Sequence, residues 1–158
     1  NKQIESGIDV AMIFDTWGSL LNDEQYEKFS LRYINKIKNA IANQNIPLIY
    51  YVRETGRKLE ALKNLDINVL GIDSTTDIGV IKKEIGDKFA LQGNLDVNIL
   101  KKDESDIIAA IKNILISYGS NSGHIFNLGT GITPDINPDK VKMLIDNLAD
   151  ISSKFHVK

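Results

Sequence analysis

Residues 123–135 read GHIFNLGTGITPD and are the most informative stretch of the chain. The apolar run at residues 124–128 is typical of a buried strand, and it ends at two glycines, Gly129 and Gly131. Glycine lets the backbone turn sharply and approach a ligand where a side chain would block it. A helix start with proline in its first turn follows at residues 137–139. The stretch therefore predicts a strand, a ligand-binding loop and a helix in succession.

The same alternation of strand and helix extends towards the N-terminus. Apolar runs typical of strands covered on both faces are followed by capped or amphipathic helical stretches. The predicted strands are residues 8–15, 47–52, 68–73, 89–92 and 124–128. The predicted helices are residues 22–43, 59–65, 78–85, 103–119 and 138–152. Because no hairpin signal separates the strands, they must pair in parallel through crossovers, and the fold class is α/β.

Two α/β architectures remain open on these patterns. A doubly wound five-stranded parallel sheet would be a complete domain at 158 residues. The alternative is part of a (β/α)8 barrel, because five units of about 32 residues scale to roughly 250 residues for eight units. Strand order separates the two architectures, and periodicity does not reveal it.

Composition indicates a single globular domain over residues 1–158, with 42% hydrophobic and 25% charged residues. A net charge of -2 provides no basic field, so we expect neither nucleic acid nor an anionic membrane as a partner. No apolar run approaches the ~18 residues that span a bilayer, and residues 1–7 lack the apolar core of a signal peptide. We therefore expect a cytoplasmic location.

The residue types also limit the chemistry open to the chain. Without cysteine there is no disulfide, no thiolate nucleophile and no cysteine-ligated metal. The two histidines, His124 and His156, lie far apart in the sequence, which argues against a histidine-rich metal site. We expect structural or surface roles for both, no bound metal, and a chemistry of carboxylates, hydroxyls, amides and backbone groups.

Several polar residues stand at predicted strand ends. Asp15 and Asp73 each end a strand, and the carboxyl ends of parallel strands share one rim. The two carboxylates could form a general acid and base pair there, or could cap the loops that follow. Gln92 and Asn94 are expected mainly to satisfy loop backbone groups. Phe14, inside an apolar strand, is expected in the core from its local pattern alone.

Three basic residues, Arg53, Arg57 and Lys58, follow the second predicted strand. Arginine can bind a carboxylate through two hydrogen bonds, so the cluster could attract a polyanionic substrate. A solvated loop is the commoner outcome for such a cluster. Residues 129–131 (GTG) resemble part of a phosphate-binding turn, but Pro134 stands where the third glycine of the full motif would be. The pattern falls short of a nucleotide-binding loop.

Three segments together resemble one protein family. Residues 14–18 (FDTWG), 91–96 (LQGNLD) and 123–135 are similar to the C-terminal half of uroporphyrinogen decarboxylases, which are enzymes of haem biosynthesis. The resemblance runs from about residue 7 to the end of the chain. It implies that the chain forms the C-terminal five βα units of a (β/α)8 TIM barrel.

The resemblance implies a carboxy-lyase that needs no cofactor. Such an enzyme removes CO2 from the four acetate side chains of uroporphyrinogen III to give coproporphyrinogen III. The implied partners are the tetrapyrrole substrate and the missing N-terminal half of the barrel, and the open strand edges lead us to expect a homodimer. The alternative functions are a non-catalytic remnant or small-molecule binding module of the same fold, and a free-standing doubly wound binder.

The resemblance also assigns binding residues. Thr16 and Thr130 are expected to hydrogen bond the substrate, and Phe14 to pack against the macrocycle. Arg53 is expected to bind a substrate carboxylate. No catalytic residue is assigned within this segment, since the family holds its substrate with arginines and an aspartate of the N-terminal half. Thr130 stands where the family typically has histidine, and Ser74 where it often has tryptophan. Threonine donates one hydrogen bond but carries no charge.

Overall fold

The computed structural model describes residues 1–85 and 87–155, and its strands form one parallel sheet. The sheet consists of β1 (Ala11–Asp15), β2 (Leu48–Val52), β3 (Val69–Gly71), β4 (Ala90–Leu95) and β5 (His124–Leu128). The predicted strands are confirmed with shifted ends. The burial on both faces that their apolar runs predicted is wrong for β1 and β5, because no residue of these two edge strands is buried. β4 continues past its predicted end at residue 92, because Gly93, Asn94 and Leu95 still pair with β5.

Helical segments connect the strands. The α-helices are α1 (Lys2–Glu5), α2 (Asp23–Tyr26), α3 (Arg32–Ile41), α4 (Leu59–Leu62), α5 (Ile78–Ile85), α6 (Glu104–Tyr118) and α7 (Pro138–Ser152). The 3-10 turns are η1 (Gly18–Leu20), η3 (Ala42–Gln44), η4 (Thr55–Lys58) and η5 (Val97–Lys101), and η2 (Glu27–Leu31) is a π-helical segment. The predicted helix over residues 22–43 thus contains a π segment in its middle. The capping box of Asn22 and Gln25 sets its start.

The strand order β1-β2-β3-β4-β5 decides between the two architectures. A doubly wound sheet reverses its strand order at a switch point, so that some consecutive strands are not neighbours. Here every strand pairs in parallel with the next strand along the chain. This is the order of a (β/α)8 barrel, so the prediction of five barrel units is confirmed and the doubly wound alternative is wrong.

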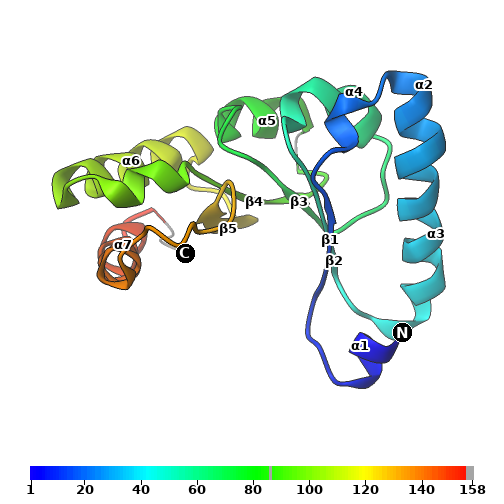
Figure 1. Ribbon diagram of the computed structural model, residues 1–158, viewed down its shortest axis with the longest axis horizontal. Helices are drawn as coiled ribbons and strands as arrows, with labels where there is room; N and C mark the ends of the chain where they lie inside the picture. The colour runs from blue at the N-terminus through cyan, green and yellow to red at the C-terminus, as the bar shows by residue number, and fades with distance from the viewer. Residues whose placement is uncertain (86, 156–158) are drawn as a thin grey trace.

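The helices are concentrated on one face of the sheet. In Figure 1, α2 to α6 form an arc around the outer side of the strands, and α7 lies against α6. No comparable layer of helices covers the inner face within the described part of the chain. None of the helices in the described residues has the length and apolar character of a transmembrane helix.

The hydrophobic core lies between the sheet and these helices. Successive side chains of a strand point to opposite faces, so only alternate residues can face the helices. Tyr50, Leu70 and Leu91 do so and are buried in the larger of two clusters. A second cluster joins α6 and α7 around Ile107 and Leu144. Burial of this outer face is the main source of stability, since each large apolar side chain buried contributes about 1.5–3 kcal/mol.

The inner face of the sheet is partly open. Phe14 on β1 is 68% exposed, and Ile125 on β5 is 42% exposed. β1 and β5 are the two edge strands, each paired on one side only in the described residues. In a closed barrel the inner face is filled by side chains from all eight strands.

Candidate functional site

A cavity of about 490 Å³ opens on the inner face at the carboxyl ends of the strands. This is the end of the barrel at which (β/α)8 enzymes carry their active sites. All five strands, or the loops that follow them, contribute to its wall. The lining residues are Met12, Phe14, Thr16, Tyr51, Arg53, Gly71, Ile72, Gln92 and residues 127–132.

The four predicted binding residues meet in this cavity. Phe14 and Thr16 lie two residues apart on β1 and its exit, and therefore point to the same face. Arg53 follows β2, and Thr130 follows β5. The core position expected for Phe14 from its local pattern is wrong, because none of the helices in the described residues covers the inner face. Substrate contact by these four residues stays a prediction.

Tyr51 is a cavity residue that sequence reasoning missed. Its hydroxyl donates to the Gly129 carbonyl oxygen at 3.0 Å, which ties β2 to the glycine loop after β5. Burial raises the pKa of Tyr51, and the nearby Asp73 carboxylate adds to the effect, so the hydroxyl stays a donor. The pairing register reveals its place, because Tyr51 pairs with Phe14 and therefore shares its face, whereas Tyr50 faces the helices. No local pattern in the sequence distinguishes the two tyrosines.

The glycine loop approaches protein backbone as well as the cavity. A Cβ atom at Gly129 would collide with the backbone of Ser74 and Asp73 in the loop after β3. A Cβ atom at Gly131 would meet no atom within 4 Å. At Gly129 the close approach is thus to the β3 loop, and the approach to a ligand expected for this loop stays a prediction. Only Gly131 leaves open space beside the cavity.

Asp15 faces a buried hydroxyl network on the outer side of the rim. Its carboxylate accepts from the Ser30 hydroxyl and, at 2.7 Å, from the Tyr50 hydroxyl. The Tyr26 and Tyr50 hydroxyls lie 2.7 Å apart. The π segment η2 contains Ser30, and such bulges often occur beside functional sites. Burial raises the pKa of both Tyr26 and Tyr50 far above the usual range, so the network consists of neutral hydroxyls around one carboxylate.

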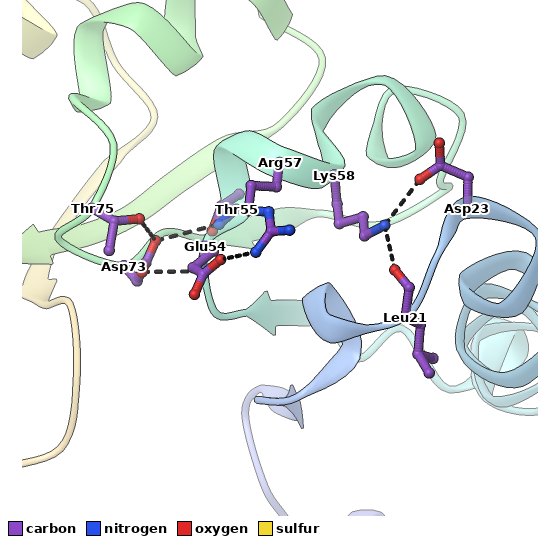
Figure 2. A network of polar contacts seen from close by, with 8 residues as sticks. All are labelled: Leu21, Asp23, Glu54, Thr55, Arg57, Lys58, Asp73 and Thr75. Atoms are coloured by element: carbon purple, nitrogen blue, oxygen red, sulfur yellow. Dashed lines mark hydrogen bonds and ion pairs between the residues drawn. The ribbon is translucent and has the colours of Figure 1, made fainter.

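Asp73 caps the neighbouring loops, as Figure 2 shows. Its carboxylate accepts from the backbone N–H groups of Glu54 and Thr55 at 3.0 and 3.3 Å. It also accepts from the Thr75 hydroxyl at 3.0 Å. Neither Asp73 nor Asp15 lines the cavity. The arrangement therefore favours the capping interpretation for Asp73, whereas Asp15 belongs to the hydroxyl network and caps no loop among the described residues. It does not favour a general acid and base pair.

The three basic residues after β2 do not act as one cluster. Arg53 lines the cavity, and its guanidinium carbon lies 5.6 Å from the centre of the Trp17 ring. Arg57 pairs with Glu54 at 2.6 Å, and its side chain is 64% exposed. Lys58 is buried and bonds to the loop after β1. Of the three, only Arg53 is placed to meet a ligand.

Some of the amide and imidazole side chains line the cavity, and others have structural roles. Gln92 lines the cavity, so its expected structural role is incomplete. Asn94 is structural, since its amide donates to the carbonyl oxygens of Asp73 and Thr76. The His124 ring stacks on the Tyr118 ring, with 4.4 Å between the ring centres, in line with the structural role expected. His156 lies outside the described residues. Those residues contain no group of three acidic or histidine side chains suited to hold a metal.

Comparison with known proteins identifies the family. The family model of uroporphyrinogen decarboxylase (URO-D) matches residues 1–150. A relative named uroporphyrinogen decarboxylase from Methylococcus capsulatus is 42% identical over 99% of this chain, and one from Coxiella burnetii is 43% identical over 98%. The chain spans 45% and 44% of the length of these two relatives, respectively.

A solved structure supports the fold independently. A methyltransferase from Methanosarcina mazei superposes with a TM-score of 0.81 over 95% of this chain and 44% of its own length. Its sequence identity is 20%, so the likeness shows the fold alone. Since the decarboxylase family model covers nearly the whole chain and the relatives are about two-fifths identical, the chain belongs to the uroporphyrinogen decarboxylase family.

Proposed function

We propose that the protein containing this chain is a carboxy-lyase that converts uroporphyrinogen III to coproporphyrinogen III. The observation that carries the proposal is a convergence in one cavity. The residues assigned to substrate binding by resemblance come from three separate strand ends. All of them line the same cavity at the carboxyl ends of the strands. Membership of the decarboxylase family supports the reaction.

The proposed reaction asks the protein to bind and orient rather than to supply a redox partner. Protonation of the electron-rich pyrrole ring lets the ring accept the electron pair that is released when the acetate C–C bond breaks. CO2 leaves, the remaining exocyclic carbon takes up a proton to become a methyl group, and the ring loses the proton that it had gained, so one proton is consumed for each CO2 released. No oxidant or reductant is consumed, and the proposal invokes no cofactor. Orientation and placed hydrogen bonds can supply much of the required rate enhancement.

The cavity offers complementary groups for such a substrate. The hydroxyls of Thr16 and Thr130 can each donate one hydrogen bond, and Phe14 presents an exposed aromatic face. Arg53 can bind a carboxylate, and Tyr51 adds a second aromatic wall with its ring centre 5.9 Å from that of Phe14. We assign these residues to substrate binding and none of them to proton transfer.

The proposal includes partners for the open face. Strand edges and apolar side chains exposed by β1 and β5 suit completion of the barrel by further strands of the same protein. Residues 1–158 would then be one part of a single barrel domain. The homodimer and the cytoplasmic location stay predictions.

The decisive experiment measures coproporphyrinogen formation by the full-length protein and by the 158-residue chain. We expect turnover by the full-length protein and none by the chain alone, because removing charge partners of a bound polyanion costs several kcal/mol per site. An inactive full-length protein that also fails to bind the tetrapyrrole would contradict the function and support a non-catalytic remnant. Turnover by the chain alone would contradict the expectation that essential substrate-binding groups lie outside these 158 residues.

A pair of substitutions tests the binding residues. In the full-length protein, Thr16→Val should weaken substrate binding by about 0.5–1.5 kcal/mol, the range for one neutral hydrogen bond. Ser74→Ala should have a smaller effect, because Ser74 does not line the cavity. Substrate titration gives both values. Equal effects would remove Thr16 from the site.

A further inference from the structure

Lys58 is a buried lysine at the rim of the barrel, with only 6% of its surface exposed. Its ammonium group donates to the Leu21 carbonyl oxygen at 2.7 Å and to the Asp23 carboxylate at 2.9 Å. It also lies 5.2 Å from the centre of the Tyr26 ring. A buried ammonium group without partners would be costly, so these contacts compensate for its removal from water.

These contacts join two loops of the rim. Figure 2 shows the Lys58 side chain reaching from the turn after β2 to the segment that carries Leu21 and Asp23, after β1. Lys58 and Leu21 are 37 positions apart in the sequence, so the bridge is a tertiary contact. Each joined loop also presents one side of a second contact, in which Arg53 lies over the ring of Trp17.

The turn after β2 is held on its other side by Asp73. The backbone N–H groups of Glu54 and Thr55 both donate to this carboxylate, as Figure 2 shows. Arg53 immediately precedes these two residues. The turn is therefore fastened to the β3 loop at its start and to the β1 loop at its end, through Lys58. Arg53 is a long flexible side chain that gains a defined place in the cavity only if its loop is fixed.

We propose that Lys58 is a positioning residue for Arg53. By fastening the β2 turn to the β1 loop, Lys58 keeps the Arg53 guanidinium against Trp17 and directed at the cavity, where it can meet a carboxylate of the substrate. The identity of that substrate rests on the proposed function. The effect of Lys58 on the contact between Arg53 and Trp17 does not.

The first test uses fluorescence, because Trp17 is the only tryptophan of the chain. Lys58→Met keeps the apolar stem and removes the ammonium group. It should increase acrylamide quenching of Trp17 to the level of Arg53→Met, which removes the cation directly. Lys58→Arg should restore the original value. Arg57→Met is the matched control, since Arg57 is a neighbouring cation that pairs with Glu54 of the same turn, and this variant should leave quenching unchanged.

Circular dichroism shows whether each variant is folded, so that a change in quenching is not mistaken for unfolding. If Lys58→Met fails to fold, Asp23→Ala serves instead, because it removes one of the two hydrogen-bonding partners of Lys58 at an exposed position and should give an intermediate increase in quenching. A folded Lys58→Met or Asp23→Ala variant with the quenching of the unmodified chain would overturn the proposal.

The second test separates positioning from general stability in the full-length protein. Lys58→Met should raise KM for the tetrapyrrole roughly tenfold with kcat unchanged, the signature of a lost contact made equally in the ground state and transition state. The double variant with Arg53→Met should be no worse than Arg53→Met alone. Additive effects would overturn the proposal even with an active enzyme. An inactive full-length protein would contradict the proposed function and leave the fluorescence result to decide the role of Lys58.

Discussion

The two faces of the sheet use alternate residues of the same strands for different purposes. On β2, Tyr50 faces the helices and is completely buried, whereas Tyr51 faces the cavity and bonds to the glycine loop. On β1, Phe14 faces the inner side and is largely exposed. The outer face therefore carries the stability of the chain, and the inner face is available for a ligand and for the rest of the barrel. This division can be tested one face at a time.

The largest effect should come from the outer face. Leu70→Ala removes a completely buried side chain of β3 and should lower the free energy of unfolding by about 2–5 kcal/mol. Phe14→Ala on the inner face should change the free energy of unfolding by less than about 0.5 kcal/mol, the usual range for surface substitutions. Urea denaturation of the chain measures both. Similar losses from the two variants would show that the inner face also carries stability.

A second comparison concerns the two glycines of the loop after β5. Gly129→Ala should destabilise the chain by about 1–3 kcal/mol, because its Cβ atom would collide with the Ser74 backbone and force the loops apart. Gly131→Ala should have little effect, since its Cβ atom would meet open space. Thermal unfolding distinguishes the two variants. A tolerated Gly129→Ala would mean that the β5 loop can move away from the β3 loop at little cost.

The third effect should appear at alkaline pH. Burial raises the pKa of Tyr26 and Tyr50 above the ordinary value of 10.0, so the folded state keeps protons that the unfolded state loses. The stabilising contribution of these two tyrosines should be constant below pH 10 and should be lost as the pH rises above it. Urea midpoints between about pH 8 and about pH 11 would measure the slope. Tyr50→Phe should flatten that slope.

Tyr33→Phe provides the matched control for this experiment. Tyr33 is half exposed on the outer surface of α3, so the substitution should leave the dependence of stability on alkaline pH unchanged. A slope that is the same in Tyr50→Phe, Tyr33→Phe and the unmodified chain would assign the alkaline loss to other groups.

The smallest effect should be self-association of the chain through its open inner face. Edge strands with exposed apolar side chains favour pairing with another copy, so the chain should associate at micromolar concentration. Phe14→Ser and Ile125→Ser together should reduce the association without unfolding the chain, because both side chains are exposed. Light scattering gives the mass. A monodisperse monomer near 17.6 kDa for the unmodified chain would show that the inner face does not self-associate.

Much of the fold could be predicted because its signals are local. Apolar runs located all five strands, and the Asn22 cap and Pro138 located the starts of two helices. The rim could be predicted as well, since parallel strands end on one side. The face of Phe14 was predicted incorrectly from its local pattern, because an apolar strand residue is buried only if something covers its face. The resemblance, and not the periodicity, placed Phe14 in a site.

The different environments of the three basic residues after β2 could not be predicted from any local sequence pattern. Arg53, Arg57 and Lys58 are equivalent cations in the sequence, yet the first lines the cavity, the second is solvated and the third is buried. The difference arises from partners in distant segments, such as the Leu21 carbonyl oxygen for Lys58. Burial of a charge depends on such partners, and they meet only when the strands pair.

The α/β class, the approximate positions of the strands and helices, and the residues available at the rim all follow from periodicity, caps and composition. The strand order, the face to which each tyrosine of β2 points, and the contacts that join the loops emerge only when distant segments pack together. Strand order depends on which segments pair across the sheet. The face of a residue depends on that pairing register, in which a shift of one position turns every side chain to the opposite face.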